Sequence, residues 1–391
     1  MCGIEFKERS MEEKKKKKKS GSKVNLIICL IAFVVMIVYL LFVDKLDNIL
    51  NAISNINPIF IVICVLFMVG YWFCESATVH TILKALHPVA KFRDTFTNTI
   101  IGQYFNCITP CASGGQPMQA YYFVKFGVPL GSGLSALLSR FIVYQFVLTV
   151  YSIFTLVIGV GQFGEDLSNK GLMPFVLIGF VVNTAVIVFL LGIAFWKKGT
   201  LKFANAIITL LAKMHIVKKP LKQRVYFTRE VNKFHQNFNF LKKNVKVILI
   251  SCFFTFIQLT LFLSISFVLY KGFGLSGTSL LQIISYQAFV LMISSFIPLP
   301  GAIGAAELGY SGFFKDILGE YTGVATMLWR IFTFYLPIIV GMVFTMTLKK
   351  KKGIESPDKV ESNDSMFDMV DPIPDDQISA HLEKSAADMQ K

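Results

Sequence analysis

Long apolar runs, separated by short charged loops, make up most of the chain. Residues 24–43 are twenty positions without a charge, which is enough to cross a hydrocarbon core of ~30 Å. Comparable runs follow at 58–83, 134–160, 172–196, 245–270 and 323–348. This pattern predicts an all-α polytopic integral membrane protein with about six full spans.

Two further apolar regions, 95–126 and 277–314, are interrupted by glycine and proline. The first interruption, 109–117, reads TPCASGGQP, and the second, 298–307, reads PLPGAIGAAE. Irregular backbone at membrane depth is tolerated only where it is buried in protein or lines a wet cavity. A pair of interrupted segments in corresponding halves of a chain points to a transport site. We therefore expect two re-entrant or broken-helix hairpins, which raise the number of crossings to about eight or more if each hairpin spans.

Composition supports a membrane protein and excludes a large soluble domain. Of the 391 residues, 54% are hydrophobic, 16% are charged and 38 are Phe. The basic residues behind the net charge of +15 gather in loops beside the apolar runs, where topology and anionic lipid head groups explain them. We therefore expect no direct nucleic-acid partner.

The charge pattern divides the chain into three regions. Residues 1–23 are a basic cytoplasmic arm and 349–391 an acidic cytoplasmic tail, and both are expected to be disordered. Residues 24–348 form the transmembrane domain. Within this domain, 197–244 carries twelve Lys or Arg against one Glu, with apolar residues at helical spacing. This segment predicts one or two amphipathic helices on the cytoplasmic membrane surface.

Loop charge also predicts orientation, because positive loops stay in the cytoplasm. The basic segments expected there are 14–19, 84–93, 197–243 and 349–352. The loops expected outside, poor in Lys and Arg, are 44–57, 161–171 and 271–277. Both termini are then cytoplasmic, the first hairpin opens to the cytoplasm and the second opens outside. Opposite access suggests an inverted repeat, although no repeat at the level of residues establishes it.

Few ionisable side chains lie in the apolar regions, chiefly Glu75, Arg140, Glu307 and Arg330. A charge at mid-bilayer costs at least ~2.5 kcal/mol, so each should face a partner or a cavity. Two acids and two bases predict ion pairs, whose pairing stays open. In one interpretation the pairs only fix helix register. In the other, the arginines hold a phosphate and the acids hold a cationic group.

The interruptions themselves offer further candidate binding groups. Glycines permit close approach and positive φ, prolines break helical hydrogen bonds, and freed amides at half-helix ends bind anions. A plain turn between two short helices is the alternative interpretation. The candidates are Gln103, Asn106, Ser113, Gly114, Gly115 and Gln116 at the first interruption and Pro300, Gly301 and Gly304 at the second.

Motifs for catalysis or cofactors are missing from the sequence. It contains no GxSxG, Walker, HExxH or paired-aspartate motif, and its seven cysteines form no CxxC. We therefore expect no catalytic residue, no metal site and no cofactor in this chain.

On these residues, the chain resembles the lysylphosphatidylglycerol synthase/flippase transmembrane family (the UPF0104 group) over about 24–348. At Ala302 the family commonly shows a second glycine, so the resemblance does not give the geometry of that turn. The matching residues are the segment 113–117, Arg140, the segment 298–307 and Arg330.

The resemblance implies a plasma-membrane flippase or translocase for an anionic or aminoacylated phospholipid such as lysylphosphatidylglycerol. Full-length members of the family also carry a cytoplasmic domain that transfers lysine from lysyl-tRNA to phosphatidylglycerol, and the family is linked to resistance against cationic antimicrobial peptides. The chain ends 43 residues past Leu348. We therefore expect that domain to be missing and a separate lysyl-tRNA-dependent lipid synthase to be a partner.

Other functions and assemblies remain open at the level of sequence. As an enzyme, the chain would be part of a phosphatidylglycerol lysyltransferase system, or a membrane protein of polyprenyl-lipid or glycosyl transfer. As a scaffold, it would recruit anionic lipids through 197–244. A homo-oligomer is a further arrangement that the sequence leaves open.

Overall fold

The computed structural model describes most of the predicted membrane domain. The basic arm, the predicted span 24–43 and the acidic tail after 352 lie outside the described residues. The described residues are 56–169, 171, 173–213, 220–294 and 297–352. These residues fold as helices joined by short connections, so the prediction of an all-α polytopic membrane protein is confirmed.

In the described part of the chain, four single helices are long and apolar enough to cross a membrane: α3 (Pro58–Leu86), α6 (Leu130–Asn169), α7 (Met173–Phe195) and α10 (Val245–Gly272). A fifth apolar stretch combines α12 (Ala305–Leu318), a 3-10 turn η1 (Gly319–Tyr321), α13 (Thr322–Arg330), a π-helical turn η2 (Ile331–Tyr335) and α14 (Leu336–Lys352). The shorter helices are α4 (Phe92–Ile108), α5 (Gly115–Lys125), α8 (Lys197–Lys213), α9 (Pro220–Lys243) and α11 (Leu280–Ser294).

The fifth stretch is not one span, because the chain reverses at Gly319. Gly319 has a φ of 55°, a conformation that glycine adopts without steric cost. Beyond the turn, the Trp329 ring stacks on the Tyr310 ring with their centroids 4.8 Å apart. Helix α12 therefore folds back on α13, and the last span is formed by α13, η2 and α14.

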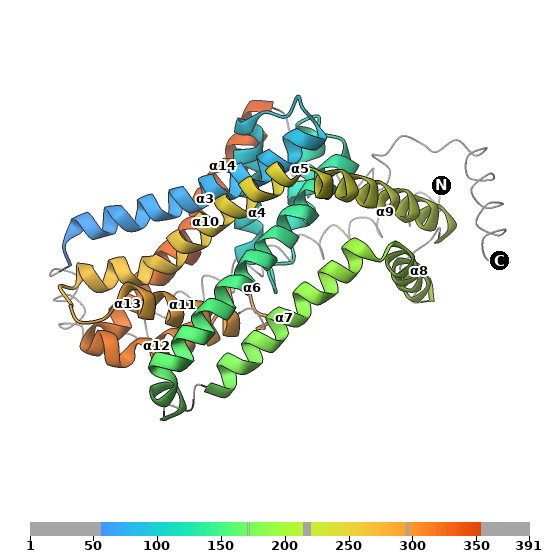
Figure 1. The fold of residues 1–391 in the computed structure, drawn as a ribbon. Helices are drawn as coiled ribbons and strands as arrows, with labels where there is room; N and C mark the ends of the chain where they lie inside the picture. The colour runs from blue at the N-terminus through green and yellow to red at the C-terminus, as the bar shows by residue number, and fades with distance from the viewer. Residues whose placement is uncertain (1–55, 170, 172, 214–219, 295–296, 353–391) are drawn as a thin grey trace, which may run out of the picture.

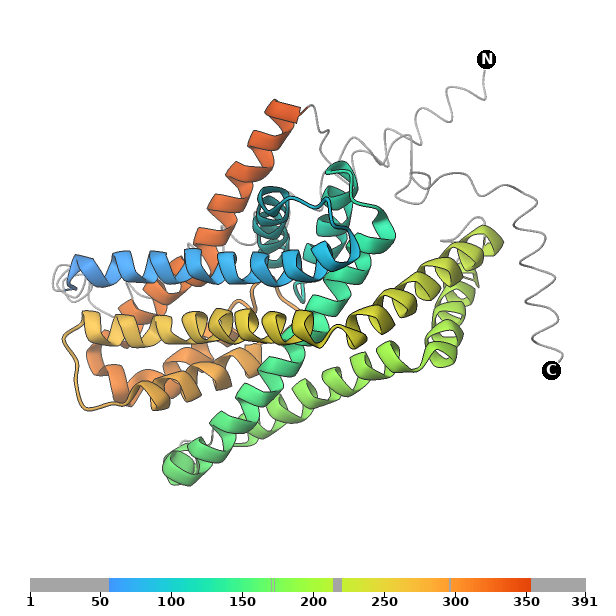
Figure 2. The same cartoon turned by 45° about the horizontal axis from the view of Figure 1, so that its top comes forward.

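Helices α3 and α10 form the central antiparallel pair. The Asn57 amide, just before α3, donates to the Gly272 carbonyl at the end of α10 over 3.3 Å. Figure 1 and Figure 2 show the two helices side by side along their lengths. Gly272 keeps this end tight, because an added Cβ would lie 3.1 Å from Ile56 and Phe60 side-chain atoms. The other elements pack around this pair.

The two interrupted regions form helical hairpins too short to span in either arm. Helices α4 and α5 have 17 and 11 residues, and α11 and α12 have 15 and 14, whereas a span needs about 20. The predicted re-entrant hairpins are therefore present.

The two hairpins open at opposite ends of the helix bundle. Leu83 at the end of α3 shares a buried cluster with Phe123 near the end of α5. At the other end, the Phe273 ring just after α10 stacks on the Tyr321 ring just after α12, with their centroids 4.9 Å apart. The hairpin α4–α5 therefore opens beside the end of α3, and the hairpin α11–α12 beside its start.

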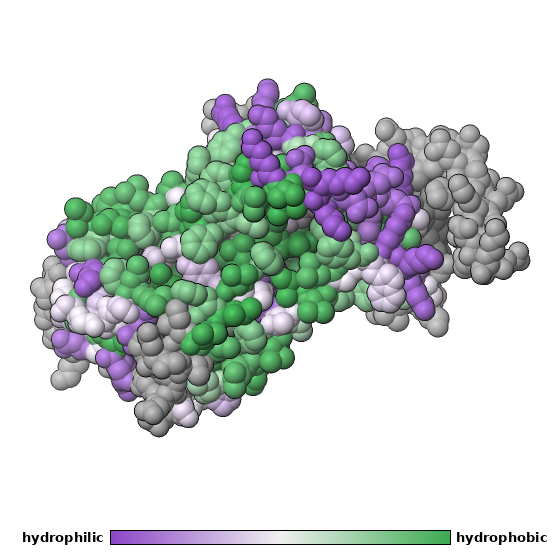
Figure 3. Space-filling model, viewed as in Figure 1, coloured by the Kyte–Doolittle hydropathy of each residue, from purple (hydrophilic) through white to green (hydrophobic). Residues whose placement is uncertain are grey.

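The basic segments gather at the end where α3 finishes. Within segment 197–244, residues 197–213 form α8 and residues 220–243 form α9, and Leu241 of α9 packs into the cluster that contains Leu83. Figure 3 shows hydrophilic residues over α9 and apolar side chains over the spans. Many of the latter are exposed, among them Leu66, Phe146, Val181 and Phe253. This surface is that of a protein surrounded by lipid.

One predicted loop boundary was wrong. We expected 161–171 to be a loop, but α6 continues as helix to Asn169. Residues 161–169 contain no proline, so their amides can extend the helix past the apolar run that ends near Val157. Hydropathy located the membrane-embedded part of the helix and not its end.

Candidate functional site

The two interruptions meet inside the bundle. Pro110 pairs with Pro300 in an isolated antiparallel bridge, so the loop between α4 and α5 touches the loop between α11 and α12. Each loop leads directly into the N-terminus of a short helix, α5 at Gly115 and α12 at Ala305. We call residues 109–114 the first loop and 299–304 the second loop.

The two loops share a left-handed turn at their centre, although they differ at their last residue, where Gly114 has a φ of −82° and Gly304 a φ of 87°. Cys111 and Ala112 have φ values of 51° and 51°, and Gly301 and Ala302 have 58° and 52°. Matching turn hydrogen bonds are Ala112 N to Thr109 O (3.2 Å), Ala302 N to Leu299 O (3.0 Å), Ser113 N to Pro110 O (3.1 Å) and Ile303 N to Pro300 O (3.3 Å). Alanine at 302 therefore preserves a turn that its counterpart at 112 also makes.

The likeness extends along the sequence as a repeat that the sequence analysis missed. Each residue of 110–140 corresponds to the residue 190 positions later, without a gap. The identical pairs are Pro110/Pro300, Ala112/Ala302, Gly114/Gly304, Phe123/Phe313, Lys125/Lys315, Gly133/Gly323, Leu138/Leu328 and Arg140/Arg330. Comparing the chain with itself at this one offset would have revealed the repeat.

The two halves are related by inversion. Each half contains a long span, a short helix, a loop, a second short helix and another span, and α3 corresponds to α10. The α3–α10 pair and the Pro110–Pro300 bridge are both antiparallel. Antiparallel pairing of equivalent elements places a pseudo-two-fold axis between the loops, and the predicted inverted repeat is present.

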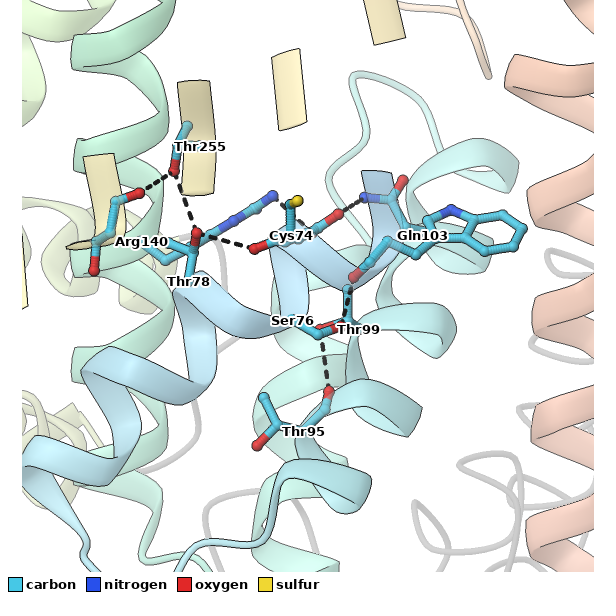
Figure 4. A network of polar contacts seen from close by, with 11 residues as sticks. Cys74, Ser76, Thr78, Thr95, Thr99, Gln103, Arg140 and Thr255 are labelled. Atoms are coloured by element: carbon cyan, nitrogen blue, oxygen red, sulfur yellow. Dashed lines mark hydrogen bonds and ion pairs between the residues drawn. The ribbon is translucent and has the colours of Figure 1, made fainter. Parts of the chain in front are cut away.

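The first ion pair lies in the middle of α3. Glu75 is 1% exposed, and its Oε1 lies 2.6 Å from Arg140 Nη2 on α6. Glu75 Oε2 accepts a hydrogen bond from Gln103 Nε2 on α4 over 2.5 Å. Figure 4 shows Arg140 and Gln103 approaching α3 from opposite sides. Arg140 also lies over the Tyr144 ring, 5.4 Å from its centroid. One carboxylate therefore joins three helices.

Buried hydroxyl groups surround this pair. Thr78 on α3 and Thr255 on α10 lie 3.4 Å apart, oxygen to oxygen, and both are buried (Figure 4). Most of these hydroxyls also donate to a carbonyl one turn earlier in their own helix, as Thr78 does to Cys74 over 3.1 Å. The Nε atom of Arg140 is buried without a hydrogen-bond partner. One donor of the Arg140 guanidinium is therefore not used by the ion pair.

The second ion pair holds the second loop. Glu307 Oε1 lies 2.7 Å from Arg330 Nε, and its Oε2 accepts from the Gly304 amide over 2.7 Å. Arg330 Nη1 donates to the Gly301 carbonyl over 3.0 Å. Arg330 is 4% exposed, and it lies 5.5 Å from the centroid of the Phe334 ring. An added Cβ at Gly301 would collide with that ring, so glycine is required there.

The arginines are equivalent in the repeat, but their acids are not. Pro117 occupies the position that corresponds to Glu307, and the acid that pairs with Arg140 lies instead on α3, at Glu75. In the first loop the Gly114 amide donates instead to the Thr109 hydroxyl over 2.8 Å. Cys111, Ala112 and Ser113 are exposed. The second loop is thus tied by an ion pair, whereas the first loop is held by its own hydrogen bonds and the bridge.

The remaining predicted residues divide by role. Gln103 joins the first ion pair, and Pro300 forms the bridge. Asn106 packs against α5, because an added Cβ at Gly115 would collide with its amide. Ser113 donates to the Pro110 carbonyl within its own loop over 2.8 Å, and Gln116 is partly exposed as the second residue of α5.

Aromatic residues beside the arginines were missed by the sequence analysis. Tyr144, Trp329 and Phe334 lie within 5.5 Å, centroid to guanidinium, of Arg140 or Arg330. Each lies one to four residues from an intramembrane arginine in the sequence. That spacing could have predicted the contact. Among the described residues, no three His, Cys, Asp or Glu side chains lie close enough to hold a metal ion.

Comparison with known proteins agrees with this architecture. Residues 27–341 match the family described as the lysylphosphatidylglycerol synthase TM region. The chain belongs to this family. It is also 25% identical over 331 residues to a UPF0104 membrane protein of Methanocaldococcus jannaschii, an alignment that covers 79% of this chain and 91% of the relative. Both interruptions and both ion pairs lie inside the region that matches the family.

The positive φ at Cys111 predicts a stabilising substitution. Cys111→Gly should raise the free energy of unfolding by about 0.5–1 kcal/mol, because the strain of a left-handed residue exceeds the entropic cost of glycine. Gly301→Ala should lower stability, since its Cβ meets Phe334. Chemical unfolding in detergent micelles measures both. Cys111→Ser keeps the Cβ and should show no gain, and an equal gain from Ser would contradict the strain argument.

The burial of Glu75 predicts strong coupling to Arg140. Glu75→Gln should lower the free energy of unfolding by about 3–5 kcal/mol, because it leaves the Arg140 charge buried without a counter-charge. The double variant Glu75→Gln/Arg140→Met should lose less than the sum of the two single changes. A parallel cycle at Glu307 and Arg330 should give weaker coupling, since the Glu307 side chain is 22% exposed. Additive losses at Glu75 and Arg140 would show that the pair is not coupled.

Proposed function

We propose that this protein translocates an anionic phospholipid, such as lysylphosphatidylglycerol, between membrane leaflets as a flippase or scramblase. The observation that carries the proposal is the meeting of two re-entrant hairpins that open at opposite ends of the bundle. Each hairpin enters the bundle from one end, and the loops of both hairpins meet at the Pro110–Pro300 bridge. Rocking one half against the other would open the site to one leaflet at a time.

The charges beside the loops match the head group of such a lipid. Arg140 and Arg330 offer guanidinium groups, which bind phosphate by paired donors. Glu75 and Glu307 offer carboxylates for an ammonium group, the extra charge that a lysyl ester carries. In the structure, the arginines and acids neutralise one another. A ligand with both charges exchanges these partners without leaving a charge unpaired in the membrane.

Depth in the membrane supports the same assignment. Arg140 lies ten residues into α6, about 15 Å along the helix axis from its start. Glu75 lies eleven residues before the end of α3, about 16 Å along its axis. These distances correspond to roughly half of the ~30 Å hydrocarbon core, where a head group in transit needs partners.

The end of the bundle that carries α8 and α9 is proposed to face the cytoplasm of a plasma membrane. Positive loops at that end favour the assignment, with both termini inside. The expected partner is a separate synthase that attaches the lysyl group to the lipid in that leaflet. The α4–α5 hairpin would then control entry from the cytoplasmic leaflet.

A disulfide between the two loops tests the movement. Because Pro110 pairs antiparallel with Pro300, position 299 lies opposite Cys111, and both side chains are exposed. Opposed Cα atoms in such pairs are about 4.5–5.5 Å apart, within the range of a disulfide. Oxidised Leu299→Cys should therefore lose most translocation of fluorescent phosphatidylglycerol in a leaflet-specific proteoliposome assay, and reduction should restore it.

Two controls accompany this experiment. Oxidised wild-type protein and oxidised Cys111→Ala/Leu299→Cys should translocate alike, because neither can form the bridge. If fully cross-linked protein translocated as fast as the same protein after reduction of the disulfide, the loops would not need to move in transport. Folded wild-type protein with the rate of empty vesicles would overturn the translocase proposal itself.

A further inference from the structure

The bend between α7 and α8 encloses a hollow away from the two loops and both ion pairs. Its volume is about 590 Å³, within the roughly 300–1,000 Å³ of ligand sites. The residues around it come from the end of α7, the bend itself and the first turns of α8. They are Phe189, Gly192, Ile193, Trp196, Lys198, Gly199, Thr200, Lys202, Phe203 and Ala206.

Local hydrogen bonds and one glycine shape the bend. The Thr200 hydroxyl donates to the Ile193 carbonyl over 2.9 Å and so ties α8 to the last turn of α7. An added Cβ at Gly199 would lie 2.6 Å from the Trp196 ring, so glycine lets the indole lie against α8. Gly192 faces open space, because an added Cβ there meets nothing within 4 Å. The hollow is therefore bounded by fixed walls and open on one side.

The walls are apolar and the rim is basic. Phe189 and Phe203 meet edge to face with centroids 6.0 Å apart, yet they remain 54% and 51% exposed. Trp196 is 69% exposed. Lys198 and Lys202 lie one helical turn apart on α8 and both are exposed. Residues 197–213 contain no Asp or Glu to neutralise them.

We infer that this hollow binds one anionic phospholipid of the leaflet at the basic end. The phosphate is held between Lys198 and Lys202, and an acyl chain lies along Phe189 and Phe203. The position favours a lipid over a soluble ligand, because α7 is a membrane span that ends at Phe195. Tryptophan and lysine at the end of a span are the residues that anchor to lipid head groups. The open side of the hollow faces the lipid in which α7 lies.

Photo-labelling in vesicles tests the site directly. The full chain is placed in phosphatidylcholine vesicles that contain a trace of photoactivatable phosphatidylglycerol, and labelled peptides are mapped by mass spectrometry. The α7–α8 bend should be labelled, and a photoactivatable phosphatidylcholine probe should label it less. Lys198→Gln/Lys202→Gln should reduce labelling by phosphatidylglycerol at least about fivefold, since each lysine near an anionic group contributes roughly that factor.

Two further variants separate the site from general surface charge. Gly192→Leu places a larger side chain in the hollow, at a position where an added Cβ meets no atom within 4 Å, and should reduce labelling by both probes. Lys243→Gln/Lys246→Gln removes the same charge from exposed lysines outside the hollow, and labelling at the bend should stay as in wild type. Unchanged labelling in Lys198→Gln/Lys202→Gln, or an equal loss in the control, would overturn the inference. The readout is binding at the bend and is independent of translocation.

Discussion

The structure depends on one constraint, that a backbone leaving a helix inside a bilayer must find its hydrogen bonds in the protein. Both loops meet this constraint with the same left-handed turn, and their leftover amides at Gly114 and Gly304 are bound by a Thr109 hydroxyl and a Glu307 carboxylate. The loops then close on each other at Pro110 and Pro300. The long helices α3 and α10 hold the hairpins so that this contact forms. The irregular backbone of both loops thereby finds hydrogen-bond partners within the protein.

Charge completes the arrangement and makes the halves unequal. The arginine of each half occupies the same position in the repeat, but one is paired with a carboxylate from α3 and the other with a carboxylate from α12. In the second half, the ion pair reaches the loop itself through Gly301 and Gly304. In the first half, the ion pair instead joins spans α3 and α6 to α4. The ion pair therefore ties the second loop directly, whereas no ion pair among the described residues reaches the first loop.

Much of this could be predicted from local chemistry. Glycine and proline inside apolar runs indicated the hairpins, because those residues end helices wherever they occur. Isolated charges indicated ion pairs, because an unpaired charge in lipid is costly. The repeat at a spacing of 190 residues is visible in the sequence and was overlooked. No physical reason prevented its prediction. The end of α6 was missed because hydropathy reports membrane depth and not helix length.

The sequence by itself determined that the chain spans a membrane, where its backbone is interrupted and which charges need partners. These properties follow from the short-range preferences of single residues and their solvent. Only the tertiary structure decided that Glu75 meets Arg140 and Glu307 meets Arg330, that the two loops touch and that the α7–α8 bend leaves a basic-rimmed hollow. Each of these depends on how far apart two helices lie and how they are rotated. That is set by packing across the whole bundle, which no local pattern encodes.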